Sequence, residues 1–92
     1  MDGEPFDVPI AGRLIRRILT KGQVAFTRHA RDEMAKDDLD AVDVTHVLRA
    51  GRVQFPEFLN GSWRYRVSTR QIFVVVAFRS QEELVVVTVW RR

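Results

Sequence analysis

The residues best suited to chemistry in this chain are arginines that alternate with large side chains in the stretch SWRYRV, residues 62–67. Arg64 and Arg66 stand two positions apart, which is the period of a β-strand, so both guanidinium groups should project from the same face. A guanidinium group binds phosphate through two parallel hydrogen bonds, and neighbouring aromatic rings stack on nucleotide bases. This face is therefore either solvated surface or a floor that meets phosphate.

His29 is the next candidate, because histidine can accept or donate a proton near neutral pH. It follows Thr27, the expected N-cap of a helix. Cleavage of RNA by its own 2′-hydroxyl needs a proton acceptor, a donor for the leaving oxygen, and cations around the phosphate. The competing interpretation is structural, with a histidine that bonds only to backbone or solvent. The residue types alone favour the structural interpretation.

Metal and cofactor sites are poorly supported by the sequence. His29 and Glu33 share a helix face at i,i+4, but no further histidine or cysteine cluster completes a zinc set. The acidic residues between positions 37 and 43 lack the alternation and the glycine of a calcium loop. No glycine-rich phosphate loop or dinucleotide fingerprint is present. We therefore expect neither a metal nor a cofactor.

Length and composition indicate one small globular domain. The chain has 92 residues, of which 46% are hydrophobic and 29% charged, and it has no cysteine for a disulfide framework. No secretion signal or apolar run of membrane-spanning length is visible, so we expect a cytoplasmic location and no membrane contact. Residues 1–48 carry 7 basic and 9 acidic side chains, whereas residues 49–92 carry 8 and 3. The second half would therefore attract an anion such as RNA. The alternative, which net charge alone leaves equally open, is that arginine is simply the preferred surface cation of this protein.

The first half of the chain is predicted to be helical, because its apolar residues recur at intervals of three and four positions. An aspartate or threonine stands where each helix would begin, and a glycine follows two of the helices. The expected elements are helices over residues 8–19, 28–36 and 41–50, with a short extended piece over 23–26.

From Arg52 onward the apolar period changes to two, which predicts strands over 52–58, 62–68, 71–79 and 83–90. Asn60-Gly61 is a strong signal for a two-residue hairpin turn, and the other connections are short, so successive strands should run antiparallel. The predicted fold class is α+β, with about three N-terminal helices packed on one face of a four-stranded antiparallel β-meander.

A two-residue loop at Thr69-Arg70 would pair Ser68 with Gln71 and define two faces of this sheet. One face should be apolar and covered by helices, with Trp63, Tyr65, Val67, Ile72, Val74, Val76, Phe78, Val85, Val87 and Val89. The other face should gather Arg64, Arg66, Phe73, Val75, Ala77, Leu84, Thr88 and Trp90. The alternative is that the first helix crosses over this second face.

Four segments resemble a known family: FTRHARDEM at 26–34, DAVDVTHVLRAGRV at 40–53, SWRYRV at 62–67 and LVVVTVW at 84–90. They are similar to a family of small bacterial proteins classed as a domain of unknown function. That family is usually placed near the RelE-, MqsR- and BrnT-like toxins, in the barnase–EndoU–colicin–RelE group of metal-independent ribonuclease folds. The resemblance covers residues 23–91 of a single domain, 1–92, and leaves 1–22 as an N-terminal extension with its helix. Family members often carry Arg-Gly where this chain has Lys36-Asp37-Asp38.

The resemblance implies a RelE-like toxin of a type II toxin–antitoxin system. Such a protein would bind mRNA, pair with a cognate antitoxin protein and act as a metal-independent endoribonuclease. The catalytic candidates are His29, Arg66 and Thr88, and the RNA-binding candidates are Arg64, Arg70 and Trp90.

An alternative function belongs to a different class. In this alternative the protein is a non-catalytic interaction module that keeps the same fold but has lost the ability to cleave RNA. It would use Phe73, Val75 and Ala77 as an aliphatic floor that binds an antitoxin-like partner protein or a second copy of the chain, as a homodimer.

Overall fold

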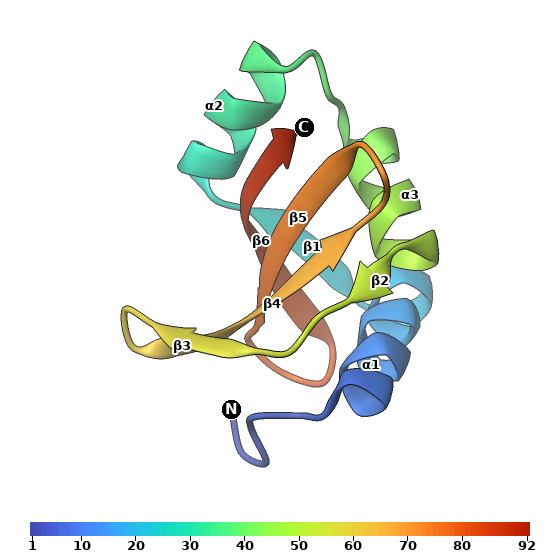
Figure 1. Cartoon of the computed structure of the whole chain (residues 1–92). Coiled ribbons are helices and arrows are strands. Elements are labelled where there is room, and N and C mark those ends of the chain that lie inside the picture. The colour runs from blue at the N-terminus through green and yellow to red at the C-terminus, as the bar shows by residue number, and fades with distance from the viewer.

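The computed structural model describes residues 1–92, and in it three helices pack against a twisted sheet (Figure 1). The elements, in chain order, are α1 (Val8–Lys21), β1 (Gln23–Phe26), α2 (Arg28–Lys36), α3 (Ala41–Ala50), β2 (Arg52–Val53), β3 (Glu57–Leu59), β4 (Ser62–Ser68), β5 (Ile72–Phe78) and β6 (Glu83–Arg91). The predicted α+β class and the three helices are confirmed.

Each helix begins at the polar residue that the sequence places there. The side chains of Asp7, Thr27 and Asp40 accept hydrogen bonds from backbone N–H groups in the first turns of α1, α2 and α3. These bonds satisfy donors that a helix start otherwise leaves free. Asp40 also forms a reciprocal capping box with Asp43. The helix boundaries therefore follow from local hydrogen bonding.

The sheet has six strands and is mixed, which corrects the predicted four-stranded antiparallel meander. Its strand order is β1-β6-β5-β4-β2, and β3 also pairs with β4. β1 runs parallel to β6, with Val24 opposite Leu84. It can lie there because Gly22 has no side chain, and a Cβ at this position would clash with the carbonyl oxygen of Glu82. The extended piece over 23–26 is thus an edge strand of the sheet.

The predicted strand over 52–58 is in fact two short strands, β2 and β3, both antiparallel to β4. The break contains Pro56, which has no N–H group to donate to the ladder. After the break, Leu59 pairs with Ser62, and Asn60 and Gly61 adopt φ values of 50° and 82°. The two-residue hairpin turn predicted at Asn60-Gly61 is confirmed.

The turn between β4 and β5 lies one residue later than predicted, and Ser68 pairs with Phe73 instead of Gln71. Thr69 and Ile72 close this turn. The Thr69 N–H donates to the Ile72 carbonyl at 3.0 Å, and the Thr69 Oγ1 accepts from the Ile72 N–H at 3.3 Å. The register changes by two residues, so every side chain of β4 and β5 keeps its predicted face.

A β-bulge in β6 changes the face of residues in the first half of this strand. Between two consecutive residues of β5, β6 carries one extra residue, Val87. Leu84 and Val86 are consequently buried in the core. Strict alternation places Val85 and Val87 in the core and Leu84 on the opposite face, and this expectation is wrong.

One hydrophobic core lies between the sheet and the helices, with α1 and α3 over the same face of the sheet (Figure 1). Its 18 buried residues come from all three helices, from β4, β5 and β6, and from Leu39. α1 contributes Ala11, Leu14, Ile15 and Ile18 to this core. The N-terminal helix is therefore part of the folding unit and more than an extension of it.

α2 lies along the second half of β6, beyond the end of β1. The Thr27 N–H donates to the Val86 carbonyl at 3.0 Å, and the Thr27 hydroxyl donates to the Val87 carbonyl at 2.8 Å. At the other end of the helix, the Arg91 N–H donates to Asp37 Oδ2 at 3.0 Å. α2 thus occupies the edge of β6 that a longer β1 would have used. The prediction that all three helices pack on one face of the sheet is therefore wrong for α2, which lies along the edge.

The segment before α1, which contains Glu4 and Phe6, is hydrogen-bonded to the fully buried Tyr65. The Tyr65 hydroxyl accepts a hydrogen bond from the Phe6 N–H at 2.9 Å and donates to Glu4 Oε2 at 3.0 Å. Burial raises the pKa of Tyr65 to about 12, against the lowering effect of the Phe6 N–H and with a further increase from Glu4. Tyr65 is therefore a structural phenol inside the core, as its position in the strand predicts.

Candidate functional site

Arg64, Arg66, Thr88 and Trp90 lie on the face of the sheet that the helices do not cover, which is the orientation that strand alternation predicts. The helices share one core with the residues of the opposite face, such as Tyr65, and all four candidates are only half-buried and outside that core. We call the uncovered side the open face and define it by Arg64, Arg66, Phe73, Val75, Thr88 and Trp90. The first helix does not cross it.

One row across the open face joins two of the catalytic candidates. Arg66 lies opposite Val75, and Val75 lies opposite Thr88. Neighbouring strands are about 4.8 Å apart, so the backbones of Arg66 and Thr88 are separated by about 10 Å. Val75 therefore lies between the two strand positions that carry Arg66 and Thr88.

The next row holds the facing pair Phe73 and Trp90, and the guanidinium groups of Arg66 and Arg92 reach their rings. We call these four residues the arginine–aromatic cluster. The rings of Phe73 and Trp90 are stacked, with centroids 4.9 Å apart and planes 5° from parallel. The Arg66 guanidinium carbon lies 5.6 Å and 5.3 Å from the two centroids, and that of Arg92 lies 4.5 Å from the Phe73 centroid. Cation–π contacts hold these guanidinium groups without using their N–H donors, which leaves the donors free for a ligand.

His29 is exposed in the first turn of α2, at the rim of the open face. The guanidinium group of Arg31 lies 5.4 Å from the centroid of Phe26, which packs against the core, so this flank of α2 faces the helix-covered side. His29 is two residues from Arg31, or about 200° around the helix, and thus lies on the flank toward the open face. The Thr27 hydroxyl, two residues before His29, donates to the carbonyl of Val87, the residue before Thr88. The segments that carry His29 and Thr88 are therefore joined at this edge.

Arg64 and Arg70 flank the arginine–aromatic cluster and do not belong to it. Arg64 lies opposite Glu57 of β3, and its Nε donates to Ser62 Oγ at 3.5 Å. Arg70 is exposed in the turn between β4 and β5, at the end of the sheet. The structure therefore brings Arg66, Thr88 and Trp90 together, with the other candidates around them.

The aliphatic floor expected for a protein-binding surface is only partly exposed. Ala77 is 7% exposed, Val75 is half-buried, and Phe73 lies beneath two guanidinium groups. The long arginine side chains cover this part of the sheet with their own apolar stems. Large exposed apolar residues lie instead around β3, where Phe55 is 83%, Phe58 57% and Leu59 48% exposed.

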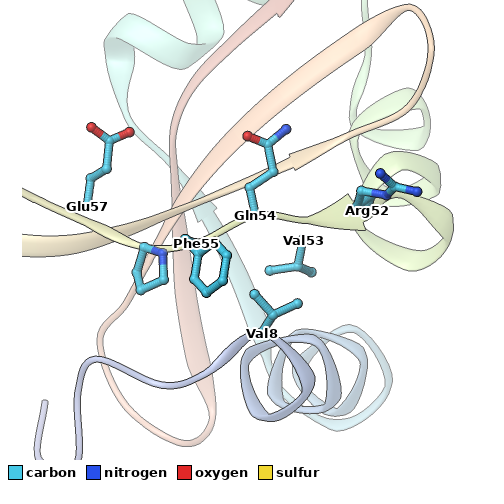
Figure 2. Close-up of a pocket in the computed structure, with 7 residues that line it drawn as sticks. Val8, Arg52, Val53, Gln54, Phe55 and Glu57 are labelled. Atoms are coloured by element: carbon cyan, nitrogen blue, oxygen red, sulfur yellow. The ribbon is translucent and has the colours of Figure 1, made fainter.

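A groove of about 760 Å³ separates the connection between β2 and β3 from the start of α1 (Figure 2). Val8, Val53 and Phe55 gather on its apolar side, whereas Gln54 and Glu57 point away from them. The Gln54 side chain therefore lies on the same side of the sheet as the open face.

Sequence reasoning missed a polar hollow at the end of the open face. Its volume is about 510 Å³, and its lining consists of Arg52, Gln54, Ser68, Thr69, Arg70 and Arg92. Arg52 lies in the hollow because it pairs with Ser68. This pairing could be predicted only if the break in the 52–58 strand were already known. Arg70 is already an RNA-binding candidate, and Arg92 carries a further signal, since it stands two residues after Trp90 and should share its face.

The interior of the protein holds no unexplained polar group. Every buried side-chain nitrogen and oxygen has a hydrogen-bond partner.

No group of three or more His, Cys, Asp or Glu side chains is arranged to hold a metal ion. None of the helices combines the length and the apolar character needed to cross a membrane.

A protein family matches most of the chain. Residues 26–91 match the family described as Domain of unknown function (DUF4258), which confirms the resemblance to a domain-of-unknown-function family. No curated protein and no solved structure matches the chain. The matched segment contains α2, α3, the strands β2 to β6 and all of the open face, and it leaves α1 outside. Because the match covers more than half of its length, the chain belongs to the family Domain of unknown function (DUF4258).

Proposed function

We propose that this protein binds single-stranded RNA on the open face of its sheet. The observation that carries the proposal is the arginine–aromatic cluster, in which Arg66 lies over the stacked rings of Phe73 and Trp90. Bases stack on aromatic rings and on guanidinium planes, and a guanidinium group with free donors binds phosphate, so the cluster offers partners for both recurring parts of a nucleotide. The excess of basic over acidic side chains in residues 49–92, 8 against 3, supports a polyanionic ligand.

We further propose that bound RNA is cleaved without a metal ion beside Thr88. In this reaction His29 accepts the proton of a 2′-hydroxyl, the 2′-oxygen attacks the adjacent phosphorus, and the bond from phosphorus to the 5′-oxygen breaks. The 5′-oxygen takes a proton from water, which leaves a 2′,3′-cyclic phosphate and a 5′-hydroxyl end. Arg66 and Thr88 donate hydrogen bonds to the pentavalent phosphate. The position of His29 at the rim of the open face supports this assignment.

In the cell, this proposal describes a RelE-like toxin that acts on mRNA in the cytoplasm. A cognate antitoxin protein of a type II system would neutralise it. The resemblance of the segments at 26–34 and 62–67 to a family that is usually placed near the RelE-like toxins supports this part of the proposal.

Binding is tested by fluorescence anisotropy with a labelled single-stranded RNA at several salt concentrations. Arg66→Ala removes a phosphate contact and the cation over the rings, so the dissociation constant should rise about tenfold and the salt slope should fall by about one. Arg17→Ala removes an equal charge from an exposed position of α1, on the helix-covered side, and is the matched control. Equal effects of the two substitutions would mean that only net charge matters, and the proposed site would be wrong.

Cleavage is tested by expressing the wild type, His29→Ala and His46→Ala in a heterologous host, with growth curves and mapping of transcript ends. His46 is the other histidine of the chain, exposed on α3, and serves as the control. The wild type and His46→Ala should slow growth and create new 5′-hydroxyl ends, and His29→Ala should do neither. Identical growth and identical transcript ends for the wild type and His29→Ala would refute the ribonuclease proposal.

The exposed residues around β3 favour a second candidate function, a non-catalytic module that pairs with another copy of the chain. Phe58 and Leu59 are exposed on β3, which pairs only with β4 and so has a free backbone edge. An edge strand of this kind can accept another strand through main-chain hydrogen bonds. Light scattering after size exclusion should then show a dimer that Phe58→Ser converts to a monomer. A monomeric wild type at high micromolar concentration would exclude this candidate.

A further inference from the structure

The polar hollow at the end of the open face gathers arginines that no acidic side chain pairs with. Three arginines line it, and neither an acidic side chain nor an apolar residue does. The three ion pairs of the protein lie elsewhere, and none includes Arg52, Arg70 or Arg92. Like charges gathered around one hollow repel one another, and an anion in the hollow would relieve that repulsion.

Two hydroxyl groups in the hollow keep their protons available for a ligand. Ser68 is only 8% exposed, and its Oγ accepts a hydrogen bond from Gln54 Nε2 at 3.4 Å. Thr69 Oγ1 accepts from the backbone N–H groups of Gln71 and Ile72 at 3.4 Å and 3.3 Å. A hydroxyl oxygen that accepts these bonds can still donate its own proton. The hollow therefore offers guanidinium and hydroxyl donors together.

The hollow adjoins the arginine–aromatic cluster. Ser68 lies opposite Phe73, and Phe73 lies opposite Trp90, so the hollow and the stacked rings share one row of the sheet. Arg92 belongs to both, because it lines the hollow and its guanidinium carbon lies 4.5 Å from the Phe73 centroid. Beyond the hollow the sheet ends at the turn after Ser68. A nucleotide stacked beside the rings would thus have its phosphate at the end of the open face.

We infer that the hollow binds a phosphomonoester, the dianionic phosphate that ends a nucleic-acid strand or belongs to a mononucleotide. Three guanidinium groups match the two charges of a monoester better than the single charge of an internal phosphodiester. The inference that the hollow binds phosphate is supported by the residues of the hollow alone. The inference that its natural ligand is the end of an RNA strand rests on the proposed function.

The first test uses inorganic phosphate and needs no RNA. Phosphate is titrated into isotopically labelled protein at constant ionic strength, with chloride as the reference anion. The amide signals of Thr69, Arg70 and Gln71 should shift and saturate with phosphate alone. Arg52→Gln should need at least fivefold more phosphate, whereas Arg17→Gln, with the same loss of charge on α1, should behave like the wild type. Unmoved amides, or equal saturation in Arg52→Gln, would overturn the inference.

The second test uses one RNA sequence in three forms, with a 5′-phosphate, with a 3′-phosphate, and with hydroxyl groups at both ends. One phosphorylated form should bind the wild type at least tenfold more tightly than the unphosphorylated form. Arg52→Gln should remove this advantage and leave the affinity for the unphosphorylated RNA within twofold. Equal affinities of the three RNAs would overturn the assignment of an RNA end.

The two tests separate the two levels of the inference. If no RNA binds but phosphate still shifts the turn amides through Arg52, the proposed function is wrong, and the hollow remains a phosphate site for a mononucleotide. If RNA binds through Arg66 but neither phosphate nor a phosphorylated end engages Arg52, the inference about the hollow is wrong, and the proposed function stands.

Discussion

Replacing Tyr65 by phenylalanine should destabilise the protein at neutral pH, and the loss should shrink at high pH. The hydroxyl accepts from the Phe6 N–H and donates to Glu4 in a fully buried position. Removing it leaves a buried N–H and one carboxylate oxygen without their partner, which costs about 1–3 kcal/mol. We expect Tyr65→Phe to lower the free energy of unfolding by about 2 kcal/mol at pH 8.

The pH dependence follows from the raised pKa of Tyr65, about 12 against the ordinary value of 10.0. Between these two values the unfolded chain has released the phenolic proton and the folded chain still holds it, so the stability of the wild type falls as pH rises. The loss should reach about 1.4 kcal/mol at pH 11. Tyr65→Phe has no phenol to titrate, so its disadvantage should shrink from about 2 to about 0.6 kcal/mol.

Urea denaturation followed by circular dichroism at pH 8 and pH 11 measures both free energies. Tyr65 is the single tyrosine of the chain, so its phenolate absorbance also reports its pKa without interference from another tyrosine. All other titratable groups are common to the two proteins and cancel in the difference. A destabilisation that stays constant from pH 8 to pH 11, or a phenol that titrates near 10, would refute this account.

Three further predictions concern the fold. Gly22→Ala should lower the unfolding free energy by about 1–3 kcal/mol in urea denaturation, because the new Cβ would meet the backbone of Glu82. A fragment limited to residues 26–91 should show no cooperative thermal transition in circular dichroism, because it lacks the core side chains of α1. Asp40→Ala should cost about 1 kcal/mol in urea denaturation, because it breaks the capping box at the start of α3, and a smaller effect than that of Asp43→Ala would contradict this.

The parts of the fold that follow from local chemistry could be predicted from the sequence. The helices start at Asp7, Thr27 and Asp40 because these side chains accept hydrogen bonds from the next turn. The outward direction of Arg64 and Arg66 could be predicted even with a wrong register, because an error of two residues does not change the face of a strand.

The parts that depend on contacts between distant segments could not be predicted in this way. β1 is four residues long, and its parallel pairing with β6 depends on the close approach of Gly22 to Glu82. The bulge at Val87 coincides with the hydrogen bond from the Thr27 hydroxyl, which joins residues 60 positions apart. Neither contact leaves a periodic signal in the sequence.

The candidate site also has a part that could be predicted from local sequence and a part that depends on contacts between distant segments. Alternation within single strands gives Arg66, Thr88 and Trp90 a common face, and the sequence is sufficient for that. The polar hollow is assembled from β2, the end of β4, a turn and the end of the chain, so it needs the pairing of Arg52 with Ser68 and the position of Arg92 in space.

The bulge in β6 also tells how relatives of this chain should be aligned. If Val87 were deleted, the strand would alternate regularly, and Leu84, Val86 and Val89 would all still face the interior. A family member one residue shorter at this position would therefore keep the same inner and outer side chains on both halves of the strand. A one-residue gap farther along the strand would turn side chains to the wrong face, so a gap belongs at Val87 or directly beside it.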